Sequence, residues 1–93
     1  MAIAIVMDFP GATLDQYDAV IAAMGLEPGG PTPEGAIFHV VTRTDDGFRV
    51  IDVWESQAQF DKFAKEQIGP QTQKAGISGP PAMTFHEVHN YFV

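Results

Sequence analysis

The sequence contains no cysteine and few basic residues. The absence of cysteine excludes disulfides, thiolate nucleophiles and cysteine-based zinc sites together. Five lysines and arginines stand against twelve aspartates and glutamates, so the formal net charge is -7. Binding to a nucleic-acid backbone or to an anionic membrane surface needs a basic patch. We therefore expect neither nucleic acid nor membrane as a partner.

Long apolar runs are also missing. No stretch approaches the roughly 20 apolar residues that span a bilayer. The first apolar run, residues 2–7, has no basic flank and is too short for a secretory signal. We therefore expect a soluble, cytoplasmic protein. A chain of 93 residues holds one domain with a modest core, so we expect residues 1–93 to form a single domain.

Hydrophobic patterning predicts four strands and two helices in the order βαββαβ. Each helix begins at a residue that is followed, three positions later, by glutamine, which is the capping-box spacing. Three prolines and three glycines leave residues 27–35 as a loop, with plain connection favoured over a lid. The predicted strands are residues 2–9, 36–43, 48–55 and 82–93, and the helices begin after Thr13 and Ser56.

Two local signals set the boundaries of these elements. Asp46-Gly47 lies between two β patterns, which predicts a two-residue hairpin turn. Pro70 is expected to end or bend the second helix, because the residue before a proline disfavours helical backbone. Gln71 to Pro81 is then expected to be irregular apart from a short helical turn.

The element order is that of the ferredoxin-like split βαβ architecture, an α+β fold. It predicts one four-stranded antiparallel sheet, with the third strand beside the first and both helices on one face. The other sheet face carries Phe and Val side chains and has no cover in a single chain. An exposed apolar sheet face indicates an interface, so we expect a homodimer that packs sheet against sheet.

The segment Val50-Ile-Asp-Val-Trp-Glu-Ser56, followed by a Phe-rich helix and a Gly-Pro, resembles the dimeric α/β-barrel superfamily. It is most similar to the antibiotic-biosynthesis monooxygenase-like small proteins, and nearly the whole chain follows their element order. The superfamily includes cofactor-free oxygenases of polycyclic aromatics, polyketide cyclases, lactone isomerases, haem-degrading enzymes and stress-related proteins. In the oxygenases a third-strand tryptophan lines the pocket, and Trp54 matches that position.

The hairpin pattern independently places polar side chains on one sheet face. With Asp46-Gly47 as the turn, His39 is expected opposite Trp54, and Asp52 lies on the same face. His39 and Asp52 would then be diagonal neighbours, within side-chain reach. A carboxylate orients an imidazole, and the pair could remove a proton from a phenol or an activated CH group. The structural alternative is a mutually satisfied polar pair that only holds the sheet.

Aromatic and terminal residues complete the candidate site. Trp54 is either a core residue or a pocket wall, and Tyr17 is either a core tyrosine or a hydroxyl that reaches the pocket. On the last strand, His86 and Asn90 are pocket candidates, with polar edge residues as the alternative. His86 and His89 point to opposite faces of a strand, which disfavours a metal site.

Other chemistry has little support. Ser56 is expected to be a helix cap rather than a nucleophile. No phosphate loop follows Gly29-Gly30, because neither a lysine nor a helix comes after it. The second helix, residues 57–67, has no histidine for haem, which leaves only His39 or His86 for such a role. We expect no cofactor and no metal.

Two functions are consistent with these observations. In the first, the dimer holds a small aromatic or polyketide-like molecule between helices and sheet and acts as a cofactor-free monooxygenase or as a cyclase or isomerase. His39 would be the base, Asp52 would orient it, and Trp54 and Tyr17 would stack on the ring. In the second, the same fold is a non-catalytic ligand-binding or stress-response module. The chain has no strong catalytic motif, which keeps the second function open.

Overall fold

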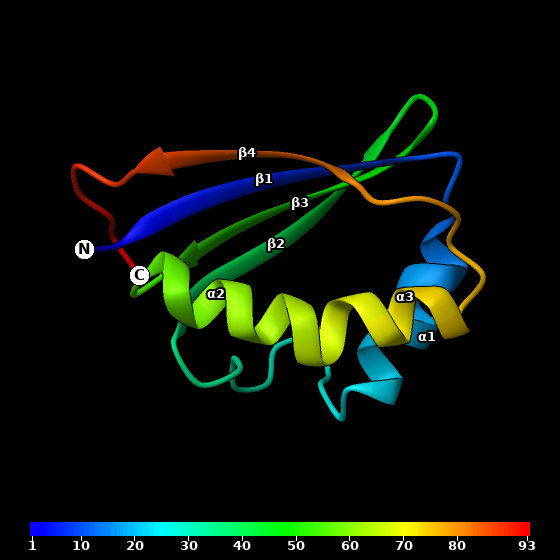
Figure 1. Ribbon diagram of the computed structural model, residues 1–93, viewed down its shortest axis with the longest axis horizontal. Coiled ribbons are helices and arrows are strands. Elements are labelled where there is room, and N and C mark those ends of the chain that lie inside the picture. Colours follow the sequence, from blue (N-terminus) through cyan, green and yellow to red (C-terminus); the bar gives the residue numbers. More distant parts are fainter.

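The computed structural model describes residues 1–93 and is an antiparallel sheet with helices on one face (Figure 1). The sheet has four strands in the order β2-β3-β1-β4, as expected for the ferredoxin-like α+β fold. In chain order the elements are β1 (Ile3–Pro10), α1 (Leu14–Ala23), β2 (Ala36–Thr44), β3 (Gly47–Trp54), α2 (Gln57–Phe63), the π-helix η1 (Ala64–Ile68), α3 (Gly69–Lys74) and β4 (Ala82–Glu87).

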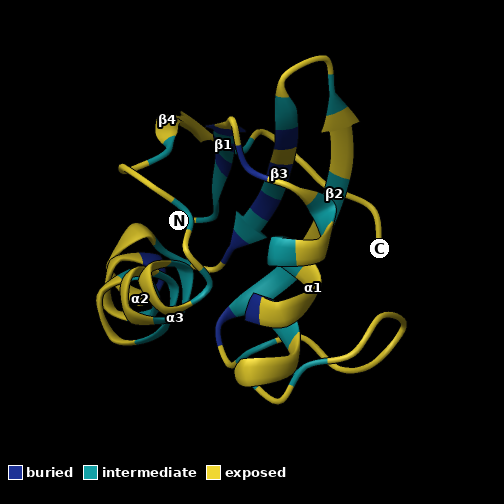
Figure 2. Cartoon of the chain, turned by 90° about the vertical axis from the view of Figure 1, so that its right-hand side faces the viewer, coloured by how far each residue is buried: buried dark blue, intermediate teal, exposed yellow.

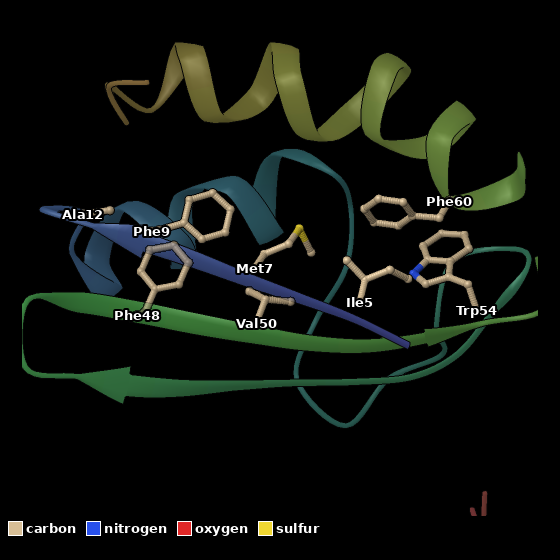
Figure 3. Packing of buried hydrophobic residues seen from close by; sticks show 8 residues of the cluster. All are labelled: Ile5, Met7, Phe9, Ala12, Phe48, Val50, Trp54 and Phe60. Carbon is tan, nitrogen blue, oxygen red and sulfur yellow. The ribbon is translucent and has the colours of Figure 1, made fainter. Parts of the chain in front are cut away.

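The core lies between the sheet and the helices, and alternate residues of the two central strands build it (Figure 3). Side chains alternate between the faces of a strand, so every second residue of β1 and of β3 points toward the helices. Burial of each large apolar side chain stabilises the fold by roughly 1.5–3 kcal/mol. These strand residues are Ile5, Met7 and Phe9 from β1 and Phe48, Val50 and Trp54 from β3, and Phe60 of α2 packs against them.

Both helix starts are capped as the sequence predicts. The Thr13 hydroxyl accepts a hydrogen bond from the Gln16 backbone N–H at 3.1 Å, and the Gln16 side chain accepts one from the Thr13 backbone at 2.9 Å. The Ser56 hydroxyl accepts from the Gln59 backbone N–H at 3.2 Å. It also donates to the Gln59 side-chain oxygen at 2.7 Å, so this second cap is only half of a capping box. Satisfying the first free N–H groups fixes where each helix begins.

The second helix does not end at Pro70, which was one of the two outcomes that the sequence predicted there. The helical path runs from Gln57 through η1 and α3 to Lys74, and Figure 1 shows one continuous rod along the sheet. Pro70 sits in the first turn of α3 and has no N–H to donate to the turn before it. The π-helical turn of Ala64–Ile68 directly precedes it and changes the hydrogen-bond spacing there.

The β2–β3 hairpin turns at Asp45-Asp46 rather than at Asp46-Gly47. Thr44 pairs with Gly47, so the pairing is shifted by two residues from the predicted one. Gly47 does not have a positive φ, and its role is steric: a Cβ there would collide with the Phe9 carbonyl oxygen. A shift of two residues preserves which side chains share a face, so the predicted face assignment of the hairpin survives.

The last strand is shorter than predicted. β4 ends at Glu87, and residues 88–93 leave the sheet after a single hydrogen bond from the Val88 N–H to the Ala2 carbonyl. All of β4 is exposed, whereas the buried residues lie on β1, β3 and the inner sides of the helices (Figure 2). The sheet face away from the helices has no cover, as predicted. Val40, Ile51 and Val53 remain partly exposed there, and Phe38 is 42% exposed.

No helix of the structure has the length and apolarity that crossing a bilayer requires.

Candidate functional site

Four of the six predicted site residues form one chain of hydrogen bonds. The Tyr17 hydroxyl lies 2.6 Å from His39 Nε2, and His39 Nδ1 lies 2.6 Å from Asp52 Oδ1. The Trp54 indole N–H donates to Asp52 Oδ2 at 3.1 Å. Three strands or helices thus contribute to the chain: α1 supplies Tyr17, β2 supplies His39, and β3 supplies the other two residues. We call this set of hydrogen bonds the Tyr17–Trp54 relay.

The strand register explains why the centre of the relay is tight. His39 and Asp52 face each other directly across β2 and β3, rather than diagonally as the predicted register required. Directly opposed residues have Cβ atoms only about 4.5–5.5 Å apart. Asp52 and Trp54 are two residues apart on β3, so both point toward the helices. The Trp54 indole and the Asp52 carboxylate therefore lie on the same face of β3, close enough for the hydrogen bond between them.

The hydrogen bonds define which atoms hold protons. A carboxylate accepts only, so the proton on the short contact to Asp52 belongs to His39 Nδ1. His39 Nε2 then accepts a hydrogen bond from the Tyr17 hydroxyl. Burial raises the pKa of Tyr17 to about 12, and the negative charges of Asp52 and Asp18 add to the effect. Tyr17 is therefore a neutral hydroxyl at physiological pH and can donate this hydrogen bond.

Burial differs along the relay. The Asp52 side chain is 6% exposed and Trp54 is 1% exposed, whereas the His39 side chain is 31% exposed. Tyr17 lies flat against the imidazole, with ring centroids 6.0 Å apart and planes 6° apart. The Asp52 carboxylate is thus enclosed and held by two hydrogen-bond donors. The His39 end of the relay is more exposed. Every buried side-chain polar atom has a hydrogen-bond partner.

A cavity of about 170 Å³ opens beside the relay. Its walls are mostly apolar and come from α1, the sheet, the π-helical region and the loop after α1. All four relay residues line it. Tyr17 also packs edge-on against Phe48, with ring centroids 5.4 Å apart. A concave apolar site with a few convergent polar groups is the usual form of a small-molecule site.

The sequence-based prediction missed the contribution of the loop at residues 27–35. Plain connection was favoured, yet residues Glu27, Gly29, Gly30, Pro31, Thr32 and Pro33 line the cavity. The signal that could have found it was the density of glycine and proline. A loop rich in glycine and proline carries few bulky side chains, so its backbone can form a wall of a cavity.

Two predicted pocket residues lie elsewhere. His86 pairs with Ala4, which lies on the sheet face away from the helices, and its Nε2 lies 3.3 Å from the Thr84 hydroxyl. Ile5, whose side chain belongs to the core, pairs instead with Phe85. Asn90 lies beyond the end of β4, so strand parity does not apply to it. Neither residue lines the cavity. Ser56 is a helix cap, as expected.

Comparisons with known proteins give a likeness of fold. No protein-family model matches the chain, and no curated protein matches it. A solved structure that is similar is a monooxygenase from the gene ActVA-Orf6 of Streptomyces coelicolor, in complex with the ligand nanaomycin D. The match has a TM-score of 0.51 and 22% sequence identity, and it covers 99% of this chain and 90% of that one. The chain thus shares its fold with this monooxygenase, and the resemblance seen in its sequence is confirmed at the level of fold.

Proposed function

We propose that this protein binds a small aromatic, polyketide-like molecule in the cavity and oxygenates it without a cofactor. The observation that carries the proposal is the Tyr17–Trp54 relay, whose phenol and imidazole end lines an apolar cavity. The likeness to a monooxygenase that holds nanaomycin D supports the substrate class. His39 is the base in this proposal, and Asp52 orients it.

The relay suits removal of a proton from a phenol or from an acidic CH group. Tyr17 can accept the substrate proton on its oxygen while it passes its own proton to His39 Nε2, 2.6 Å away. The resulting imidazolium lies 2.6 Å from the Asp52 carboxylate, which stabilises the new positive charge. The substrate anion is electron-rich and can react with dioxygen, the co-substrate in this proposal. A CH₂ group and O₂ then give a carbonyl group and water.

A second function is a non-catalytic ligand-binding or stress-response module of the same fold. The observation in its favour is that the relay residues satisfy one another, as a purely structural polar cluster would. A cyclase or isomerase would use the same proton transfer without oxygen. The cavity beside Trp54 favours a role that involves a ligand, because a structural cluster needs no void beside it.

The test is oxygen consumption and product formation with hydroxylated anthracenes and anthrones. His39→Ala should lower turnover by roughly 10²–10⁴-fold, the usual contribution of a general base. His89→Ala, which removes an exposed histidine beyond β4, is the matched control and should leave turnover unchanged. Equal turnover by His39→Ala and the native chain would exclude His39 as the base. Binding without turnover in the native chain would favour the second function.

We further propose that the working unit is a homodimer that packs the uncovered sheet faces together. The apolar residues Val40, Ile51 and Val53 on this face support the proposal. Phe38, a large apolar residue on the same face, is 42% exposed. A second copy would bury this face without any new element.

A further inference from the structure

A second cavity lies on the far side of Met7 from the relay. It occupies about 370 Å³ between the π-helical region, α3 and β4. Its own walls include Phe60, Met83 and the loop before β4. None of the relay residues lines it, so it is a separate space rather than an extension of the same void.

The two cavities share one partition. Met7, Ile68, Thr72 and Ile77 line both of them. Met7 points from the middle of β1 toward the helices and is 2% exposed (Figure 3). A methionine side chain has three rotatable bonds and no branch, so it can change conformation at small cost. Ile68 ends the π-helical turn, a feature that is frequent at functional sites.

Size decides what the first cavity can hold by itself. Its volume is about 170 Å³. An engineered protein cavity of about 150 Å³ binds one benzene molecule. The first cavity therefore accommodates about one aromatic ring next to the relay. A ligand with three fused rings must place the remaining rings elsewhere.

We propose that the binding site is bipartite. One hydroxylated ring lies in the first cavity, and the apolar remainder of a fused polycyclic ligand passes Met7 into the second cavity. This inference rests on the proposed function, because the relay defines the end at which the polar ring lies. The chemical class it names is an elongated polycyclic phenol, polar at one end and apolar at the other. Phe60 and Met83 would contact the apolar end.

The experiment compares two probes, phenol with one ring and 1-anthrol with three. Two substitutions fill the second cavity from opposite walls: Met83→Trp on β4, where Met83 is 42% exposed, and Gln73→Trp on α3, where Gln73 is exposed. Gln57→Trp at the start of α2 is the control, because Gln57 is exposed and lines neither cavity. Dissociation constants are measured by calorimetry.

Both cavity-filling variants should weaken 1-anthrol binding at least tenfold and change phenol binding less than twofold. In NMR spectra of the native chain, 1-anthrol should perturb Met83 and Tyr17 together, and phenol should perturb only Tyr17. If 1-anthrol perturbs Tyr17 and His39 but binds Met83→Trp and Gln73→Trp as tightly as the control, the bipartite site is wrong and the proposed function stands. If neither probe perturbs Tyr17 or His39 in the native chain, both proposals are wrong.

Discussion

At the scale of single residues, the relay depends on one short hydrogen bond between helix and sheet. Tyr17 comes from α1 and meets His39 of β2 at 2.6 Å. Burial and the negative charges of Asp52 and Asp18 keep the Tyr17 hydroxyl protonated, because they raise its pKa. The raised pKa of Tyr17 therefore predicts how the stability of the protein changes at alkaline pH.

Tyr17 should titrate late and should link stability to pH. Tyr91→Phe leaves Tyr17 as the only tyrosine, so absorbance at 295 nm follows Tyr17 alone; its midpoint should lie near pH 12. An unfolded tyrosine ionises near pH 10, so the unfolded state binds fewer protons between these values. Stability should be unaffected by Tyr17 below pH 10 and should fall as the pH rises toward 12.

The control is Tyr17→Phe. Urea unfolding at pH 9 and pH 11 should show a smaller loss of stability in Tyr17→Phe than in Tyr91→Phe, because only Tyr91→Phe retains Tyr17 and its raised pKa. A midpoint near pH 10 for Tyr17, or equal losses in the two variants, would contradict the assignment.

At the scale of elements, the long helix contains a proline that its neighbours accommodate. Gly69 precedes Pro70 and has helical dihedral angles, φ -56° and ψ -58°. A Cβ on the residue before proline clashes with the proline ring in this conformation. Gly69 has no Cβ, which explains how the helical path passes through the pair. In the sequence, Pro70 indicated an end or a bend of the helix, whereas the helical path continues past it to Lys74.

A double-mutant cycle tests this explanation. Glycine to alanine in a helix normally stabilises by about 0.5–1 kcal/mol. With Pro70 present, Gly69→Ala should give no stabilisation or should destabilise. In the Pro70→Ala background, Gly69→Ala should stabilise by the usual amount. Free energies of unfolding from urea titrations provide the comparison, and equal effects in both backgrounds would disprove a role for the missing Cβ.

At the scale of the whole molecule, one sheet face is packed and the other is not. Helices cover the inner face, where Ile5 and Trp54 are almost completely buried. The outer face has Val40, Ile51 and Val53 along neighbouring strands. The only ion pair on that face joins Arg49 to Asp8 at 2.7 Å and lies toward the hairpin end. The apolar part of the outer face is therefore the proposed dimer interface.

Sedimentation equilibrium should give a mass near twice the 10.1 kDa of one chain. Val53→Lys should shift the equilibrium to monomer, because it places an unpaired charge in the buried interface. Gln57→Lys adds the same charge at an exposed position of α2 and should leave the mass unchanged. A native chain that sediments as a monomer at high concentration would refute the dimer.

The sequence alone was enough to predict the fold class, the sharing of faces along the hairpin and the capped helix starts. These features depend on local periodicity and on neighbouring residues, as at Thr13 and Gln16. It also grouped His39, Asp52 and Trp54, because strand alternation does not change when the register shifts by two residues.

The remaining features depend on contacts between elements that lie far apart in the sequence. Gly47 is needed for its contact with β1 rather than for the hairpin turn, because a Cβ there would collide with the Phe9 carbonyl oxygen. His86 lies on the outer face because the pairing of β4 with β1 sets its orientation, and the sequence of β4 alone carries no such information. Tyr17 reaches His39 only through the packing of α1 on the sheet. The cavity, likewise, is a space between elements, which no single element specifies.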